Sequence, residues 1–479
     1  MLGVQMNFDS LVRSLGRESL LVVQSSDALA SSVAKSAKEQ AERNDAYAYG
    51  KPPTPVRLSR PLRTSPAQVL HELGVATTFL TASPLAQVAK HWAHVRYCAT
   101  LTNARGHLAL SRHAEDVVYH HKVTQSEQLG IGLALVVAKA ALRELYPDWE
   151  FHAVDAEVAL KAGFITGVGD VESANNTKKR PDYFLVGHHT SGRRTDFKVV
   201  ILECKGTHGA KNFAIEQLAR ASVQVEALRV GGRTPPSLMV ASCLARSRIT
   251  SYVLDPPGDG GLWSGPNRDL DELLRGSPED QHWQPQQAAT AAEDAQEPET
   301  AGGAAAAPSG TASPADEDLP PGAPDIFEIP EERRGWFTQV LTRAVAAATL
   351  LFAGNSAAAR DYATPRQRGD DLSTEQPTLL DLDPPWALST TTSLRLPNGL
   401  RLEGTRYRTP LPDGKVLEVF RGVERRLYRH LADGELGPYL RAAPRTYRKW
   451  SQARLDDAVL SLGRDGTALV VRITNDRRG

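Results

Sequence analysis

The sequence has few cysteines and no long apolar run. Its three cysteines, Cys98, Cys204 and Cys243, are too few and too widely spaced for a disulfide framework or a zinc cluster. There is no run of about 18 apolar residues, and the first residues lack the basic and apolar regions of a signal peptide. We therefore expect a soluble, cytoplasmic protein with no membrane partner.

The sequence also lacks net charge and a phosphate-binding loop. Lysine plus arginine number 56, as do aspartate plus glutamate, so the overall charge argues nothing about a nucleic-acid partner. No Gly-x-x-x-x-Gly-Lys-Ser/Thr motif occurs, which argues against a nucleotide-driven motor within the chain. The length is enough for roughly two to four domains.

The composition changes along the chain and predicts several segments. Residues 1–50 and 51–123 show the apolar spacing of helices, and part of the first segment is expected to be flexible. Residues 276–325 are rich in Ala and Pro and contain ten acidic residues but no lysine or arginine, which predicts a disordered acidic linker. Residues 326–385 are predicted to form a helix followed by a connector.

The clearest chemical pattern runs from Arg180 to Gly206. The segments 183–186 and 199–202 are rich in β-branched, aromatic and aliphatic residues, which is typical of strands. A polar segment with two glycines, residues 187–196, separates them. The sequence therefore predicts a β-hairpin.

Three charged residues sit within this apolar pattern. Glu203 and Lys205 are two positions apart, so both side chains leave the same face of the second strand, and Asp182 begins the first strand beside them. Two carboxylates at one sheet edge suit a hard cation such as Mg²⁺, and a lysine beside it can orient the attacking water. The pattern favours metal-assisted hydrolysis of a phosphodiester. A charged surface hairpin without chemistry is the structural alternative.

Pro181-Asp182 followed by Glu203-Cys204-Lys205 resembles the PD-(D/E)XK signature of the restriction-endonuclease-like nucleases. The resemblance implies that Asp182 and Glu203 bind Mg²⁺ or Mn²⁺ and that Lys205 assists the nucleophile. It covers less than a third of the chain, within a domain that we place at residues 124–275. The signature is short, so the order of the surrounding elements matters.

That order agrees with an α/β fold containing a restriction-endonuclease-like αβββαβ core. A helix is predicted over residues 126–146, with Ser126 as its N-cap, and a first strand over 151–160. The hairpin supplies the next two strands. An amphipathic helix over 213–228 and an apolar strand over 237–244 complete the set.

The resemblance implies two further site residues and leaves a basic cluster beside them. Family members place a glutamate on the first helix near the metal and a glutamine on the second helix. Glu127 and Gln217 stand at those places, although a favourable helix-end charge and a boundary residue are equally good interpretations. Lys178, Lys179 and Arg180 directly precede Asp182 and are candidates for binding a nucleic-acid backbone.

Residues 386–479 read as a separate, basic, β-rich module. Asn398-Gly399, Asp413-Gly414 and Asp465-Gly466 lie between apolar segments and predict hairpins. The module carries 18 Lys or Arg against 10 Asp or Glu, with aromatic residues among them. Nucleic-acid binding, a solvated face over a small core, and docking of the acidic linker all remain open. A homodimer contact or a protein partner could also use this module.

The sequence therefore predicts a Mg²⁺-dependent endonuclease, most consistent with DNA as its substrate. Defence against foreign DNA and DNA repair both fit the resemblance. The alternative is a non-catalytic protein that binds nucleic acid or protein and uses the nuclease fold as a scaffold.

Overall fold

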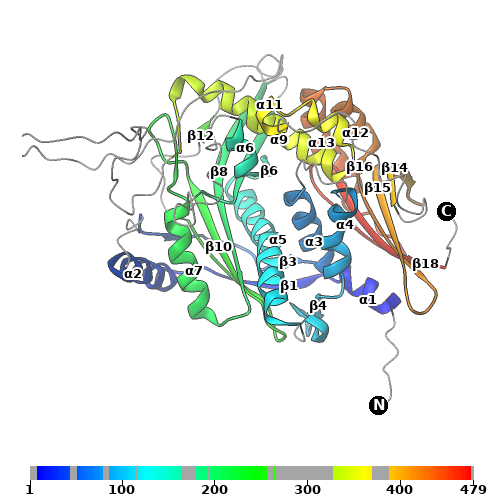
Figure 1. Ribbon diagram of the computed structural model, residues 1–479, viewed down its shortest axis with the longest axis horizontal. Helices are drawn as coiled ribbons and strands as arrows, with labels where there is room; N and C mark the ends of the chain where they lie inside the picture. Colours follow the sequence, from blue (N-terminus) through cyan, green and yellow to red (C-terminus); the bar gives the residue numbers. More distant parts are fainter. Residues whose placement is uncertain are drawn as a thin grey trace, which may run out of the picture.

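The computed structural model describes residues 8–43, 51–78, 86–114, 117–162, 180–191, 194–255, 263–264, 327–368 and 388–475. Within these ranges two large β-sheets lie next to each other, with helices around and between them (Figure 1). One is a mixed sheet of eleven strands, and the other is an antiparallel sheet from the C-terminal part of the chain. The chain is therefore an α/β protein with a separate C-terminal sheet, as predicted.

The strands of the large sheet run in the order β4-β5-β1-β11-β10-β8-β7-β6. In that order they span Leu101–Ala104, His107–Leu110, Ser19–Gln24, Thr250–Asp255, Ser237–Cys243, Arg194–Thr207, Tyr183–Ser191 and Glu150–Asp155. β7 pairs antiparallel with both β6 and β8, whereas β10 runs parallel to β8. The predicted hairpin is confirmed, but its strands extend well into the polar segment that was expected to be a loop.

Helices α5 (Tyr119–Leu145) and α7 (Lys211–Gln224) cover opposite faces of this sheet. Alternate residues of a strand point to opposite faces, so Leu202 packs in one core with Leu133 of α5. Its neighbour Ile201 packs in the other core with Leu218 of α7. The sheet is thus buried on both sides where the predicted site residues lie.

Several predicted boundaries are wrong. The first long helix begins at Tyr119, seven residues earlier than Ser126, and its N-cap residue Val118 makes no side-chain cap hydrogen bond. The strand predicted over 151–160 ends at Asp155, because the Asp155 side chain accepts a hydrogen bond from the Val158 N–H and starts α6 (Ala156–Lys161). The second helix ends at Gln224, and Leu228 begins the short strand β9 (Leu228–Val230).

The N-terminal segments contain strands where helices were expected. Strand β1 is the apolar run Ser19–Gln24 and pairs parallel with β11 inside the large sheet. Strands β4 and β5 form a hairpin in which Arg105 and Gly106 both have positive φ, at 52° and 87°. A short apolar run fits a buried strand as well as a helix, so the local pattern alone did not distinguish the two.

The C-terminal sheet has the order β14-β15-β16-β18-β17. These strands span Leu388–Arg395, Arg401–Pro410, Val416–Glu424, Thr467–Thr474 and Ala458–Leu462. Gly399, Gly414 and Gly466 have positive φ values of 89°, 82° and 84° at the three turns, which confirms the predicted hairpins. Two helices, α12 (Arg425–Ala432) and α13 (Leu436–Trp450), interrupt the module and carry much of its basic charge.

The two sheets share a hydrophobic core. Val419 of β16 and Val471 of β18 pack in one cluster with Leu70 and Leu73 of α3 (Pro66–Ala76). Helix α9 (Arg334–Phe352), which agrees with the helix predicted after residue 325, lies along the top of both sheets in Figure 1. The acidic segment 276–325 lies outside the described residues.

The remaining elements complete the layers around the two sheets. The helices are α1 (Phe8–Leu15), α2 (Asp27–Arg43), α4 (Ala86–Tyr97), α10 (Ser356–Arg360) and α11 (Pro365–Arg368), and the strands are β2 (Thr54–Pro55), β3 (Leu62–Thr64), β12 (Trp263–Ser264) and β13 (Phe327–Ile329). In the described part of the chain, no helix has both the length and the apolar character needed to cross a membrane.

Candidate active site

The β7–β8 pairing places Asp182 beside Glu203. Tyr183 lies opposite Leu202, so the residue before Tyr183 lies next to the residue after Leu202. The Asp182 N–H donates to Glu203 Oε2 at 3.1 Å, and the Cys204 N–H donates to Asp182 Oδ2 at 2.8 Å. The structure therefore brings together the two predicted metal ligands.

Lys205 belongs to the same group. Its Nζ lies 2.5 Å from Glu203 Oε1, and its side chain is 24% exposed whereas that of Glu203 is fully buried. Cys204, between them, points to the opposite face and packs in the core with α5. The alternation predicted for Glu203, Cys204 and Lys205 is confirmed.

Joint ionisation of Asp182 and Glu203 is electrostatically unfavourable. Burial and the neighbouring Asp182 charge raise the pKa of Glu203 to about 8, against a smaller opposing effect of Lys205. Burial also raises the pKa of Asp182, although Lys205 and the Cys204 N–H oppose that rise. One ammonium therefore does not fully compensate the two carboxylates.

Gly206 fixes the end of β8 against α5. A Cβ at this position would lie 1.8 Å from the Ser126 carbonyl oxygen, so only glycine allows this close approach. Ser126, which was predicted to cap the helix, instead donates its hydroxyl to the Val123 carbonyl inside α5. The helix thus contacts the strand directly beyond Lys205.

Gln217 lies on α7 next to the same strand end. Its Nε2 donates to the Gly206 carbonyl at 3.3 Å. Its Oε1 is buried and has no hydrogen-bond partner among the residues that the structure describes. A buried acceptor without a donor is rare, and this one belongs to a side chain at the end of the strand that carries Glu203 and Lys205.

Glu127 lies near the site without joining it. It is exposed, on the third turn of α5 and not the first as predicted. Burial mainly raises the pKa of Tyr183, and the Glu127 charge adds a smaller rise. Within the described residues, no group of three or more His, Cys, Asp or Glu side chains is placed to hold a metal. The predicted role of Glu127 as a third ligand therefore has no support in this geometry.

The predicted basic cluster is described only at Arg180. Its Nη2 pairs with Glu157 of α6, and its carbonyl accepts from Gln224 Nε2 at 3.4 Å. Lys178 and Lys179 lie outside the described residues. Arg180 is about two-fifths exposed, so this pairing leaves part of its guanidinium accessible.

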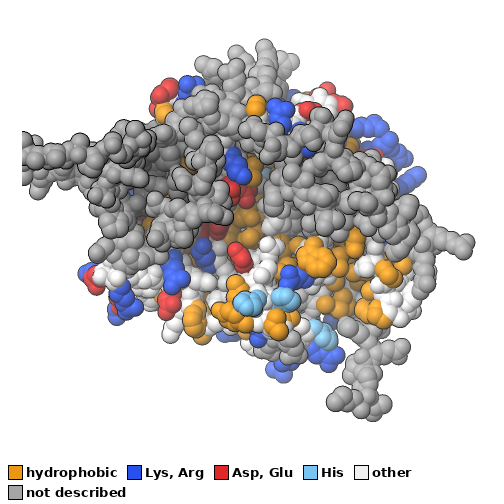
Figure 2. All heavy atoms as spheres, viewed as in Figure 1, with side chains coloured by type: hydrophobic (Ala, Val, Ile, Leu, Met, Phe, Trp, Pro, Cys, Tyr) orange, Lys and Arg blue, Asp and Glu red, His pale blue; other side chains and the backbone are white. Residues whose placement is uncertain are grey.

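The donor set fits one hard divalent cation. Asp182 and Glu203 offer carboxylate oxygens, and burial raises the pKa of each. The unpaired Oε1 of Gln217 belongs to a side chain at the same strand end. Mg²⁺ takes one or two carboxylates and keeps several waters, so this set suffices without a third acidic residue. On the face in Figure 2, acidic and basic side chains gather between α7 and α5.

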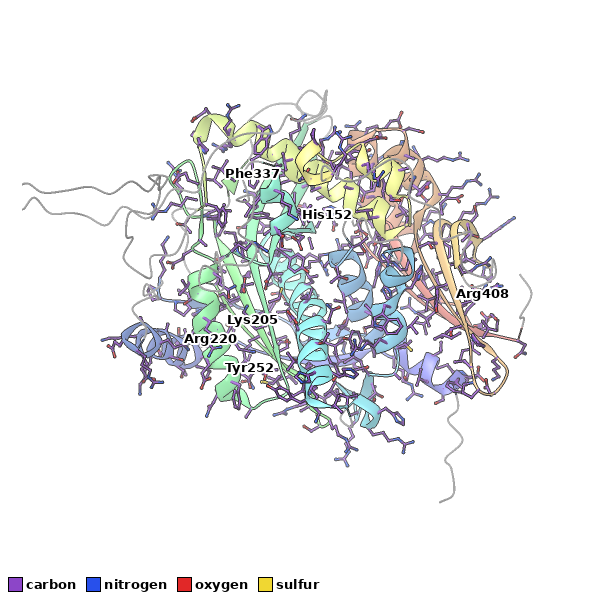
Figure 3. The ribbon with its side chains drawn as sticks, viewed as in Figure 1. His152, Lys205, Arg220, Tyr252, Phe337 and Arg408 are labelled. Atoms are coloured by element: carbon purple, nitrogen blue, oxygen red, sulfur yellow. The ribbon has the colours of Figure 1, made fainter. Side chains whose placement is uncertain are left out.

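The sequence interpretation did not identify His152 and His188, two buried histidines on β6 and β7. Figure 3 shows His152 well away from Lys205, towards the helices of the C-terminal part. A histidine at an inward position of an otherwise apolar strand, as in Phe151-His152-Ala153-Val154, was the available signal.

Comparison with protein-family models, curated proteins and solved structures found no match for this chain.

Proposed function

We propose that the chain is a metal-dependent endonuclease of the restriction-endonuclease-like type that hydrolyses phosphodiester bonds in DNA. The observation that carries the proposal is the contact of Asp182, Glu203 and Lys205 at one end of the β7–β8 hairpin. The order α5-β6-β7-β8-α7-β10, into which the short elements α6 and β9 are inserted, supports the same core. In it β10 is parallel to β8 and the two helices cover opposite faces.

The residues divide the work according to their chemistry. Asp182 and Glu203 would hold Mg²⁺ or Mn²⁺, which when bound polarises water and offsets charge on a phosphate. Lys205 presents an ammonium beside that position, where it can donate to the attacking water or to a phosphate oxygen. Gln217 donates to the Gly206 carbonyl at the strand end, and its unpaired Oε1 would be available as a further acceptor.

The test is cleavage of supercoiled plasmid, linear duplex and single strands with Mg²⁺ or Mn²⁺. The protein is compared with Lys205→Ala and with Lys35→Ala, a change of an exposed lysine on α2. We expect cleavage that EDTA and Lys205→Ala abolish and Lys35→Ala leaves intact. Cleavage that survives Lys205→Ala, or none on any substrate with either metal, would reject the proposal.

One observation favours a non-catalytic alternative. Lys205 already pairs with Glu203, so the ammonium can neutralise this carboxylate without a cation. On this alternative the chain binds nucleic acid or another protein, and the nuclease fold is a scaffold. Isothermal titration with Mn²⁺ separates the two, because binding that requires Asp182 and Glu203 is expected only for the nuclease.

A further inference from the structure

A cleft of about 730 Å³ lies between the outer strands β6 and β7 and the helices α12 and α13. We call it the arginine cleft. Its lining includes the five arginines Arg426, Arg441, Arg445, Arg448 and Arg464 and, on the strand side, Glu150, His152, His188 and His189. None of these residues belongs to the candidate active site.

The charge of the arginine cleft is strongly positive. Five arginines face two acidic residues, Asp148 and Glu150, an excess of three positive charges with histidines neutral. Glu150 is already paired with Arg464 at 2.6 Å. Arg426, Arg445 and Arg448 are exposed, and no acidic side chain of the described residues pairs with them. Such a surface attracts an anionic ligand.

A second observation points to a ligand in the same cleft. His188 lines it and is only 4% exposed, yet neither ring nitrogen has a hydrogen-bond partner in the described part of the chain. Its ring packs on His152 and Phe197, with centroids 5.6 Å and 5.5 Å away. An unpaired buried imidazole is costly, and a polar ligand that reached the ring from the cleft would reduce that cost.

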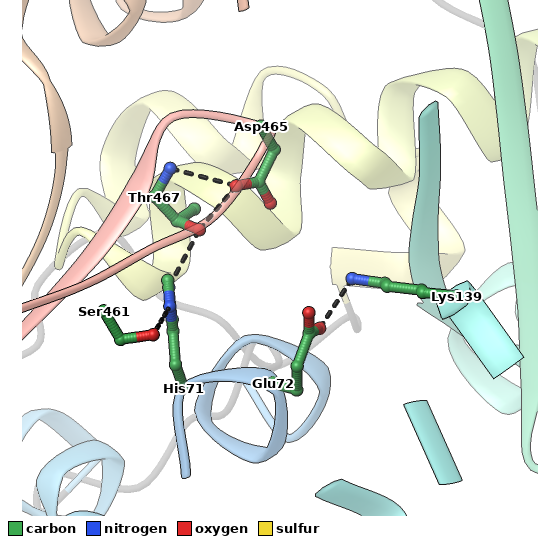
Figure 4. Close-up of polar contacts among 6 residues, drawn as sticks. All are labelled: His71, Glu72, Lys139, Ser461, Asp465 and Thr467. Carbon is green, nitrogen blue, oxygen red and sulfur yellow. Dashed lines mark hydrogen bonds and ion pairs between the residues drawn. The ribbon is translucent and has the colours of Figure 1, made fainter. Parts of the chain in front are cut away.

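A hydrogen-bond network holds the turn that brings Arg464 into the cleft. Figure 4 shows His71 bonded through its two ring nitrogens to Ser461 and Thr467, and the Thr467 hydroxyl donating to Asp465. These bonds tie α3 to the turn between β17 and β18. Arg464 lies in this turn and also stacks on the Tyr447 ring at 5.0 Å. Arg464 is therefore pre-organised before a ligand arrives.

The position of the cleft relates it to the candidate active site. His188 is six residues beyond Asp182 along β7, which corresponds to roughly 20 Å at the rise of a strand. A DNA strand covers that distance in about six nucleotides. A single short duplex is thus long enough to contact both places.

We propose that the arginine cleft binds the phosphate backbone of DNA as an anchoring site separate from the cleavage site. Arginine forks match phosphate oxygens in pairs, and Tyr447 adds an aromatic surface within the cleft. The choice of DNA as the anion rests on the proposed nuclease function, whereas the excess of positive charge and the unpaired His188 do not.

The experiment measures binding of fluorescein-labelled duplex DNA of mixed sequence by anisotropy in EDTA, so that cleavage plays no part. The test variant is Arg445→Gln with Arg448→Gln. The control is Arg429→Gln, an exposed arginine on α12 outside the cleft. We expect the test variant to bind at least about tenfold more weakly and its salt dependence to fall by about two phosphate contacts, with the control unchanged.

Three outcomes would decide against the inference. Equal weakening by Arg429→Gln would show that charge alone matters, and unchanged binding in the test variant would remove the cleft as an anchor. Poly-glutamate that competes as well as DNA of equal charge would identify an acidic polypeptide as the ligand.

Loss of binding by the test variant without metal-dependent cleavage by the wild type would uphold the cleft and reject the nuclease. Unchanged binding in the test variant, together with wild-type cleavage that needs Asp182, would reject the cleft as an anchor and uphold the nuclease.

Discussion

Asp182 and Glu203 are tied together through the backbone, each carboxylate accepting an N–H from the strand that carries the other. Glu203 Oε2 accepts from the Asp182 N–H at 3.1 Å, and Asp182 Oδ2 accepts from the Cys204 N–H at 2.8 Å. The strand pairing therefore sets the separation of the two carboxylates. Burial raises the pKa of both carboxyls, and the neighbouring Asp182 charge raises that of Glu203 further.

Replacing Asp182 by asparagine is expected to abolish cleavage without destabilising the fold. An amide oxygen can still accept from the Cys204 N–H, while the like charge beside Glu203 disappears. We expect at least about 100-fold slower plasmid cleavage and a melting temperature in EDTA equal to or slightly above that of the wild type. A large fall in melting temperature would show that Asp182 is structural.

Glu203 makes the metal-free protein less stable as the pH rises. The pKa of its carboxyl is 4.5 in the unfolded chain, and burial raises it to about 8 in the folded protein. Between these pH values the folded protein keeps a proton that the unfolded chain has released. Stability from this group is therefore present at low pH and lost as the pH rises to 8. Between pH 6 and pH 8 the loss is up to about 2 kcal/mol.

Urea unfolding in EDTA at the two pH values measures this loss, with Glu203→Gln as the comparison. The variant is expected to lack this part of the pH dependence, and Mg²⁺ is expected to stabilise the wild type more at pH 8 than at pH 6. Identical pH profiles for the wild type and Glu203→Gln would contradict the assignment.

The local pattern of the motif was enough to predict the core of the site. Alternation along β8 placed Glu203 and Lys205 together, and the apolar runs on both sides of the polar tip fixed the hairpin. The prediction of Glu127 depended instead on where the helix begins. That boundary was misplaced because Ser126 looks like a cap, whereas α5 begins at Tyr119 and its first residues are exposed.

Other features depend on contacts far apart in the sequence. Strand β1 pairs with β11, more than 200 residues later, and nothing local distinguishes it from a short helix. The arginine cleft joins β7 to α13, whose basic residues were noticed without a partner surface. Long-range pairing of this kind is not encoded in local periodicity.

Gly206 is expected to be intolerant of any side chain. Alanine would place its Cβ against the Ser126 carbonyl. Gly206 pairs with Ser242 in the sheet and Ser126 lies within α5, so both backbones are held by secondary structure. Gly206→Ala is expected to lower the free energy of unfolding by about 1–3 kcal/mol and to reduce cleavage by moving Lys205. Gly16→Ala is the control, because its Cβ would meet the Val459 side chain at 3.3 Å and the Arg13 carbonyl oxygen at an ordinary 3.8 Å. Equal effects of the two changes on cleavage would argue against a positioning role for Gly206.

The buried histidines are expected to make the protein sensitive to acid, in the opposite direction to Glu203. Burial lowers the pKa of His152 to about 4, an effect that the nearby Asp465 and Glu72 oppose and Lys139 reinforces. The unfolded chain therefore takes up this proton at a higher pH, near 6.5, and stability is lost as the pH falls below that value. From pH 6.5 to pH 5 the loss from His152 is about 2 kcal/mol. We expect His152→Asn to flatten urea-unfolding profiles in this range, while His113→Asn, a change of an exposed histidine, leaves them unchanged. A profile as steep in His152→Asn as in the wild type would show that other groups carry the acid sensitivity.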